Sequence, residues 1–110
     1  MTETLKLIKE KLEEKKALDI VILDISEISI MADYFLIASA SNLRQLNALK
    51  DIIEEEMSKM GLHYSHIEGN SNASWLLMDY GDIVIHLFDI ESRQFYDLEH
   101  IWKGAKRIDL

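Results

Sequence analysis

Hydrophobic residues near the N-terminus recur every three or four positions. Leu5, Ile8 and Leu12 share one side of a helix in this spacing, and lysine and glutamate residues fill most positions between them. The pattern predicts an amphipathic helix that packs on a core through its apolar side. The mixture of lysine and glutamate on its other side is typical of a solvated helix surface.

Two short apolar runs follow this helix. Residues 19–25 are rich in β-branched side chains, residues 34–38 form a second run, and both are too short for a typical helix. Hydrophobic residues follow one another in these runs without regular alternation, as they do in strands covered on both faces. We therefore expect two buried strands.

A long amphipathic helix is predicted after the second strand. Its apolar positions, three or four residues apart, are Leu46, Leu49, Ile53, Met57 and Met60. Asn42 and Gln45 have the spacing of a capping box, and Ser41 is the alternative cap. Gly61 supplies the left-handed residue that commonly ends a helix. Both ends of this helix are therefore specified by nearby residues.

Three more strands are expected in the second half of the chain. Residues 62–68 form a weaker strand, and residues 75–80 and 83–88 form two stronger strands on either side of Gly81. Because so short a turn joins only antiparallel neighbours, the last two strands form a hairpin.

The C-terminal segment is predicted to be helical. Phe95, Leu98 and Trp102 are three or four residues apart and mark a buried stripe on one side of this helix. The basic residues that follow, where a helix C-terminus favours positive charge, are Lys103, Lys106 and Arg107.

The order of these elements is helix, two strands, helix, three strands and helix. This order predicts a mixed α/β or α+β fold with a single mixed five-stranded sheet and helices packed on it. The second strand, the long helix and the third strand would form a right-handed crossover. The chain has no proline and only four glycines, which leaves no flexible linker, so residues 1–110 are expected to form one domain.

Composition and charge exclude several classes of function. The chain has 12 lysines and arginines against 20 aspartates and glutamates, a net charge of −8 that repels phosphate backbones, so we expect no direct reading of nucleic acid. The absence of cysteine excludes thiol nucleophiles, cysteine-type zinc sites and disulfides. No apolar run is long enough for a membrane span and the first residues lack a secretory signal, which predicts a cytoplasmic protein without membrane contact.

The polar residues do not form a pattern typical of catalysis. His63 and His66 would point to opposite faces of a strand, which disfavours a shared metal ion. His86 lies within an apolar strand, where a neutral, hydrogen-bonded histidine of the core or its rim is expected rather than a general base. The Gly-x-Ser-x-Gly motif of a nucleophile elbow is missing. We expect no catalytic residue, no metal and no cofactor.

Four segments of the chain carry a family resemblance. They are residues 33–35, Arg44 with Gln45, the block W-x-L-x-D-Y-G-D-x-V-x-H over residues 75–86, and residues 91–99. Together they resemble the Iojap family, also called ribosomal silencing factor S, and the match runs nearly end to end. One departure is Ala40, where family members usually carry glycine in the turn before the long helix.

The resemblance implies a translation repressor. Such proteins bind the large ribosomal subunit through ribosomal protein L-fourteen and hinder joining of the small subunit, which lowers protein synthesis under nutrient limitation. The resemblance also implies a homodimer and a fold similar to that of nucleotidyltransferases. The Gly-Ser and Asp-x-Asp pairs that serve metal-assisted catalysis in those enzymes are missing here, and Asp79 and Asp82 instead flank a turn. A small nucleotidyltransferase-like enzyme and a ribosome-assembly adaptor stay open as alternatives.

Partner-binding residues are expected on the first strand of the hairpin. Trp75, Leu77 and Asp79 alternate along this strand and share one face, which would present an aromatic, an aliphatic and an acidic side chain together. The same alternation also allows Trp75 and Leu77 to lie in the core. The family resemblance favours the exposed arrangement.

Further partner-binding candidates lie close to the turn and at the long helix. Tyr80 and Asp82 flank Gly81, and the acidic side chains of this region suit a basic ribosomal protein. Arg44, at the start of the long helix, is the second place where we expect docking.

Overall fold

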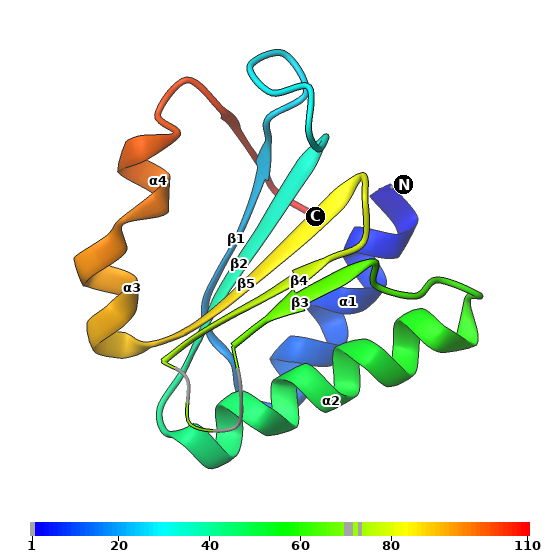
Figure 1. Ribbon diagram of the computed structural model, residues 1–110, viewed down its shortest axis with the longest axis vertical. Coiled ribbons are helices and arrows are strands. Elements are labelled where there is room, and N and C mark those ends of the chain that lie inside the picture. The colour runs from blue at the N-terminus through cyan, green and yellow to red at the C-terminus, as the bar shows by residue number, and fades with distance from the viewer. Residues whose placement is uncertain (1, 70–71, 73) are drawn as a thin grey trace.

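The computed structural model describes residues 2–69, 72 and 74–110, and these form a six-stranded mixed sheet with helices on both faces (Figure 1). The elements are α1 Thr2–Glu14, β1 Leu18–Asp24, β2 Tyr34–Ala40, α2 Leu43–Lys59, β3 His66–Glu68, β4 Trp75–Asp79, β5 Ile83–Asp89, α3 Ile90–Tyr96, α4 Leu98–Ile101 and β6 Lys106–Ile108. The strand order is β3-β4-β5-β2-β1-β6. No helix in the described part of the chain is long and apolar enough to cross a membrane.

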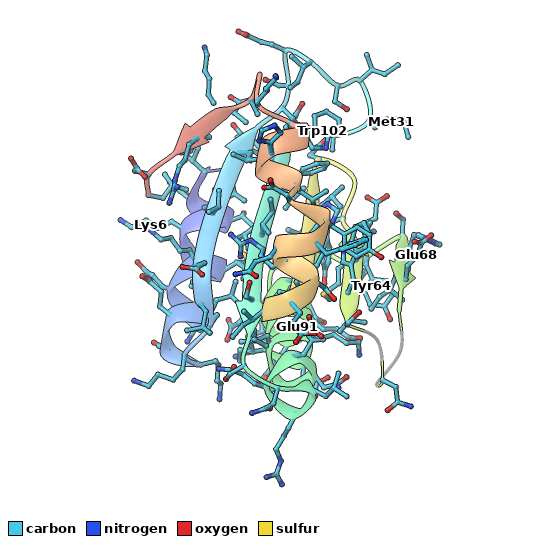
Figure 2. The ribbon with its side chains drawn as sticks, turned by 90° about the vertical axis from the view of Figure 1, so that its left-hand side faces the viewer. Lys6, Met31, Tyr64, Glu68, Glu91 and Trp102 are labelled. Carbon is cyan, nitrogen blue, oxygen red and sulfur yellow. The ribbon has the colours of Figure 1, made fainter. Side chains whose placement is uncertain are left out.

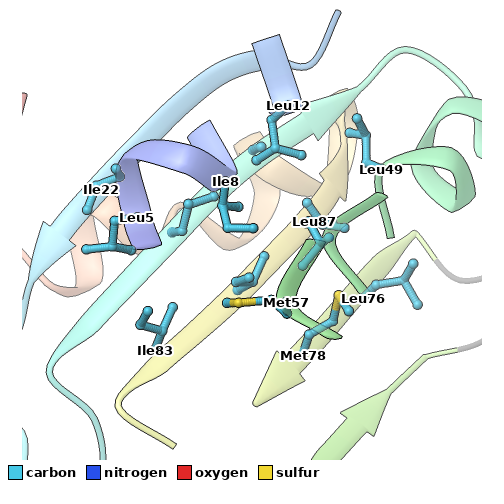
Figure 3. Close-up of a cluster of buried hydrophobic side chains, with 14 of the residues drawn as sticks. Leu5, Ile8, Leu12, Ile22, Leu49, Met57, Leu76, Met78, Ile83 and Leu87 are labelled. Carbon is cyan, nitrogen blue, oxygen red and sulfur yellow. The ribbon is translucent and has the colours of Figure 1, made fainter. Parts of the chain in front are cut away.

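The helices α1 and α2 close one face of the sheet with an apolar core (Figure 3). Leu5, Ile8 and Leu12 are at most 1% exposed, as their spacing predicted. They meet Leu49 of α2 and Leu87 of β5, which are also fully buried. This face is therefore a sealed hydrophobic layer.

Both ends of α2 follow the prediction. Asn42 is the N-cap, and its side-chain Oδ1 accepts the backbone N–H of Gln45 at 2.8 Å. Gln45 Oε1 accepts the backbone N–H of Ser41 at 2.6 Å, so the reciprocal bond of the capping box reaches one residue further back. Gly61 has φ +77°, and the N–H of Leu62 bonds the carbonyl of Met57 at 2.9 Å, which closes the helix with a Schellman motif. Met60 follows the last helical residue and is 37% exposed rather than buried.

The strand paired with β2 differs from the prediction. β5, not β3, lies parallel to β2, and β3 pairs with β4 at the sheet edge. β5 contributes five buried side chains, whereas two of the three residues of β3 are exposed. The more apolar strand takes the central position because it buries more surface there. The crossover therefore runs from β2 through α2, β3 and β4 to β5.

The C-terminal segment also differs from the prediction. Asp97 adopts a left-handed conformation with φ 44° and separates two short helices, so Phe95 and Leu98 do not share one stripe. Phe95 is 83% exposed, while Leu98 is buried. Residues Lys106–Ile108 form β6 and pair with the free edge of β1, which gives six strands in place of five. The local sequence around residue 106 does not indicate a strand. The strand forms because the free edge of β1 offers unpaired backbone groups for hydrogen bonds.

The helices α3 and α4 cover only part of the other face. Figure 2 shows them lying along the middle of the sheet, while β3, where Glu68 is labelled, lies to one side of them. α3 packs on β5 and β2. Among the residues that the structure describes, no helix therefore covers the β3 and β4 part of this face.

Candidate protein-docking face

β4 presents its side chains alternately to the two faces of the sheet. Leu76 and Met78 are at most 1% exposed and join the core under α1 and α2. Trp75, Leu77 and Asp79 point to the other face and are half-buried. The three residues that the sequence placed on one face therefore do lie together, on the side that α3 leaves partly open.

Trp75 is held by aromatic neighbours on β5 and α3. Its ring stacks on Phe88 with centroids 5.0 Å apart and is tilted against Tyr96 at 4.5 Å. Its indole Nε1–H donates a hydrogen bond to Nδ1 of His86 at 3.1 Å. An aromatic side chain held in this way loses little conformational freedom when a partner covers it.

His86 is the buried polar residue beneath this aromatic group. It is 4% exposed, and burial lowers its pKa to about 4, so the ring is neutral near pH 7. Its ring also meets Phe35 edge to face at 4.7 Å. These contacts confirm the predicted neutral, hydrogen-bonded histidine.

β3 adds polar side chains that the sequence did not indicate. His66 pairs with Asp79 and Glu68 pairs with Leu77, so both face the same side as Trp75. His66 Nε2 lies 2.9 Å from Glu68 Oε1. The alternation within residues 66–68 was visible in the sequence, but the pairing with β4 was not. We define the open patch as His66, Glu68, Trp75, Leu77, Asp79 and Tyr96.

α3 extends the aromatic character of the open patch. Tyr96 is 39% exposed, and Phe95 meets it edge to face at 5.1 Å. The sequence signalled Tyr96 only through its place next to Phe95 and within residues 91–99 of the family resemblance, because the predicted stripe followed an uninterrupted helix. The break at Asp97 changes which side chains face inward.

Asp79 has a structural role in the turn as well as a place in the open patch. Its Oδ1 accepts the backbone N–H of Gly81 at 2.8 Å. Gly81 has φ +87°, a conformation that glycine adopts at little cost. The turn-forming interpretation of Asp79 is thus confirmed, and its half-buried carboxylate also contributes charge to the patch.

Tyr80 and Asp82 lie outside the open patch. Tyr80 points toward the α2 side, where its ring meets Tyr64 edge to face at 6.2 Å. Burial, with a smaller contribution from the charge of Glu54, raises the pKa of Tyr80 to about 12. The backbone carbonyl of Asp82 accepts the N–H groups of Asp33 and Tyr34, which ties the hairpin turn to the start of β2.

Arg44 lies at the other end of the strands. β2 runs into α2 at Ala40, whereas the turn with Asp82 immediately precedes β5, which is parallel to β2. Arg44 is exposed in the first turn of α2. The turn with Asp82 and the start of α2 are therefore at opposite ends of the strands, whereas Trp75, which pairs with Phe88 near the end of β5, lies toward the same end as Arg44.

A charged cavity lies on the opposite side of α3 from the open patch. It has a volume of about 440 Å³ and is lined by Asp19, Val21, Arg93, Gln94, Asp97 and Arg107. Arg93 is 9% exposed, and its Nη1 donates to Ser39 Oγ at 2.9 Å. Across residues 2–69, 72 and 74–110, no group of three or more histidines, aspartates or glutamates is placed to hold a metal ion.

One protein family, described as "Ribosomal silencing factor during starvation", matches residues 1–110. The chain belongs to this family. The ribosomal silencing factor RsfS of Bacillus subtilis is 38% identical over 98 residues, which cover 89% of this chain and 83% of that protein. A crystal structure of a Chromobacterium violaceum protein superimposes with a TM-score of 0.88 at 32% identity, covering 96% of this chain and 88% of that one.

The chain is also similar to a mouse protein. The mouse protein named "Mitochondrial assembly of ribosomal large subunit protein 1" is 32% identical over 94 residues, covering 83% of this chain and 41% of that protein. Membership in the silencing-factor family confirms the resemblance seen in the sequence. The superposition confirms the mixed α+β fold.

Proposed function

We propose that this chain is a non-catalytic translation repressor that binds the large ribosomal subunit through ribosomal protein L-fourteen. On the subunit it hinders joining of the small subunit and lowers protein synthesis under nutrient limitation. Family membership supports the ribosomal role. The observation that supports the position of the docking site is the open patch, where Trp75 and Leu77 are half-buried beside two carboxylates on the part of this face that α3 and α4 leave open.

The chemistry of the open patch fits a basic protein partner. Glu68 is exposed and Asp79 is half-buried, and the chain as a whole carries a net charge of −8. Such a field attracts a basic ribosomal protein and speeds its association. Trp75 and Tyr96 supply the large aromatic area that typically dominates interface energetics.

The proposed binding residues fall into three groups. Trp75, Leu77 and Asp79 form the centre on the open patch. Tyr80 and Asp82 would meet the partner around the end of the hairpin, and Arg44 is the alternative site at the start of α2. Substitution of one residue from each group distinguishes these places.

The absence of catalysis is part of the proposal. His86 is the buried histidine of the face, but its Nδ1 is occupied by the indole of Trp75 and its pKa is about 4. Such a ring is a poor general base near neutral pH. A nucleotidyltransferase-like enzyme would bind a nucleotide with magnesium, and calorimetric titration with ATP and magnesium tests this alternative directly.

Subunit joining provides the test of repression. Purified large subunits are titrated with the chain, small subunits are added, and light scattering reports their joining. We expect joining to fall as the chain saturates the large subunits, and Trp75→Ala to require a higher concentration for the same effect. Unchanged joining at saturation would contradict the repressor function.

A ribosome-assembly adaptor is the second candidate function. It is favoured by the name of the mouse relative, which refers to assembly of the large ribosomal subunit. An adaptor would bind immature large subunits more tightly than mature ones. Co-sedimentation with both kinds of particle separates the two functions, and we expect mature subunits to bind at least as well.

We also propose a homodimer. Phe95 and Ile90 of α3 are 83% and 46% exposed, and a second copy would shield such apolar side chains. Sedimentation at micromolar concentration should show twice the mass of one chain. The mass of a single chain under these conditions would contradict the dimer.

A further inference from the structure

His86 and Trp75 form a hydrogen bond whose direction is fixed by chemistry. An indole N–H can only donate, so Nδ1 of His86 must accept at the observed 3.1 Å. The neutral imidazole then carries its proton on Nε2. The bond therefore selects one tautomer of a ring that is 4% exposed.

The other nitrogen of His86 indicates that this residue is not optimised for stability. Nε2 is buried and has no hydrogen-bond partner among the residues that the structure describes. An unpaired buried donor is destabilising, and an apolar side chain of similar size would avoid that cost. Phe35 and Phe88, whose rings lie 4.7 Å and 6.3 Å from His86, would pack equally against an aliphatic residue.

Aromatic packing alone does not determine how the indole of Trp75 is oriented. Stacking on Phe88 involves the flat face of the ring, and a ring turned over about its side-chain bond keeps much of this contact. Only one orientation brings Nε1 to His86. The hydrogen bond thus distinguishes between orientations that packing leaves nearly equal.

We propose that His86 is a positioning residue for the open patch. His86 holds the indole of Trp75 in one orientation, so that a fixed edge of the ring faces the protein partner. This inference rests on the proposed function, because the partner is the basic ribosomal protein that the open patch fits. A ring that is already oriented does not lose this freedom on binding, which raises affinity.

Two variants of His86 in the full chain test the hydrogen bond itself. His86→Leu removes the acceptor and keeps an apolar side chain, whereas His86→Asn places an amide oxygen close to the position of Nδ1. Both are made with Trp102→Phe, so that the indole proton seen by NMR belongs to Trp75. We expect hydrogen exchange of this proton to accelerate about tenfold in His86→Leu and to return toward the His86 rate in His86→Asn.

Affinity for large subunits tests the positioning role. We expect His86→Leu to bind about fivefold more weakly, the effect of one hydrogen bond, and His86→Asn to recover most of the affinity. In a Trp75→Phe chain, which has no indole donor, His86→Leu should cause no further loss. A loss of equal size in that background would overturn the inference, because it would show that His86 acts without the indole.

The outcomes separate this inference from the proposed function. Unchanged indole exchange in His86→Leu overturns the positioning role, whatever the ribosome binding. If Trp75→Ala binds large subunits normally, the open patch is not the docking face and the proposed site fails even where indole exchange depends on His86. Weakened binding of Trp75→Ala with normal binding of His86→Leu overturns the positioning role alone.

Discussion

The two faces of the sheet use the same strands and differ in what covers them. Under α1 and α2, side chains such as Leu36, Ile53 and Leu87 are fully buried, and the layer is largely apolar, with Glu56 as a buried charged residue of α2. Under α3 and α4, the sheet also carries polar groups such as His86 and Ser39, and its β3–β4 part is open. The closed face holds the fold together, and the open face is where a partner can bind.

The contrast arises from the lengths of the helices. α2 has 17 residues and α1 has 13, while α3 and α4 have 7 and 4. Longer amphipathic helices bury more apolar surface, so the first face is sealed. A short broken pair leaves the aromatic side chains on one side of α3 exposed and a charged cavity on the other. Because α3 and α4 cover this face only in part, a partner can reach it.

The largest expected effect is on the closed face. Ile53→Ala should lower the free energy of unfolding by about 3 to 4 kcal/mol, because it opens a cavity in a fully buried layer. Affinity of the folded protein for large subunits should not change. Urea denaturation and a binding titration measure the two quantities. Reduced affinity of the folded variant would contradict the conclusion that one face stabilises the fold and the other binds the partner.

Acid should weaken the fold through the open face. The pKa of His86 is about 4 in the folded protein and about 6.5 in the unfolded chain, so the unfolded chain binds a proton that the folded chain does not between these values. Stability is therefore complete above about pH 6.5 and falls as the pH drops toward 4, by at most about 3 kcal/mol. His86→Leu lacks this contribution. When the free energies of unfolding of the unchanged chain and of His86→Leu are plotted against pH from 7 to 4, the two curves should converge or cross. Parallel curves would contradict the low pKa of His86 in the folded protein.

Removal of the aromatic anchor should affect binding more than the other docking substitutions. Trp75→Ala should weaken large-subunit binding by about 2 kcal/mol, or roughly thirtyfold. Tyr80→Ala, on the α2 side of the hairpin, should weaken binding less and chiefly lower stability. Arg44→Ala tests the other predicted docking place, at the start of α2. An effect of Arg44→Ala larger than that of Trp75→Ala would move the docking site to the start of α2.

Reversal of one charge on the open patch should give the smallest effect. Asp79→Lys should slow association with a basic partner, and the difference should shrink at high salt because exposed charges are screened beyond about 10 Å at 0.1 M. Asp51→Lys is the matched control, since it changes the same charge at an exposed position of α2. Stopped-flow association rates at two salt concentrations test this, and equal slowing in both variants would indicate long-range charge rather than a local contact.

The sequence by itself determined the elements whose signals are local. The spacing of Leu5, Ile8 and Leu12 predicted α1, Asn42 and Gly61 specified the ends of α2, and Gly81 specified the hairpin. The alternation along β4 correctly predicted that Trp75, Leu77 and Asp79 share a face. Each of these features depends on residues within a few positions of one another, and short-range sterics and hydrogen bonds decide them.

The tertiary structure decided everything that depends on distant partners. β5 rather than β3 lies beside β2, residues 106–108 complete the sheet at β1, and Phe95 faces solvent after the helix breaks at Asp97. The bond from Trp75 to His86 joins two strands and becomes possible only when their register is set. Strand pairing depends on the competition of all apolar surfaces for the centre of one sheet, and no local pattern records the outcome of that competition.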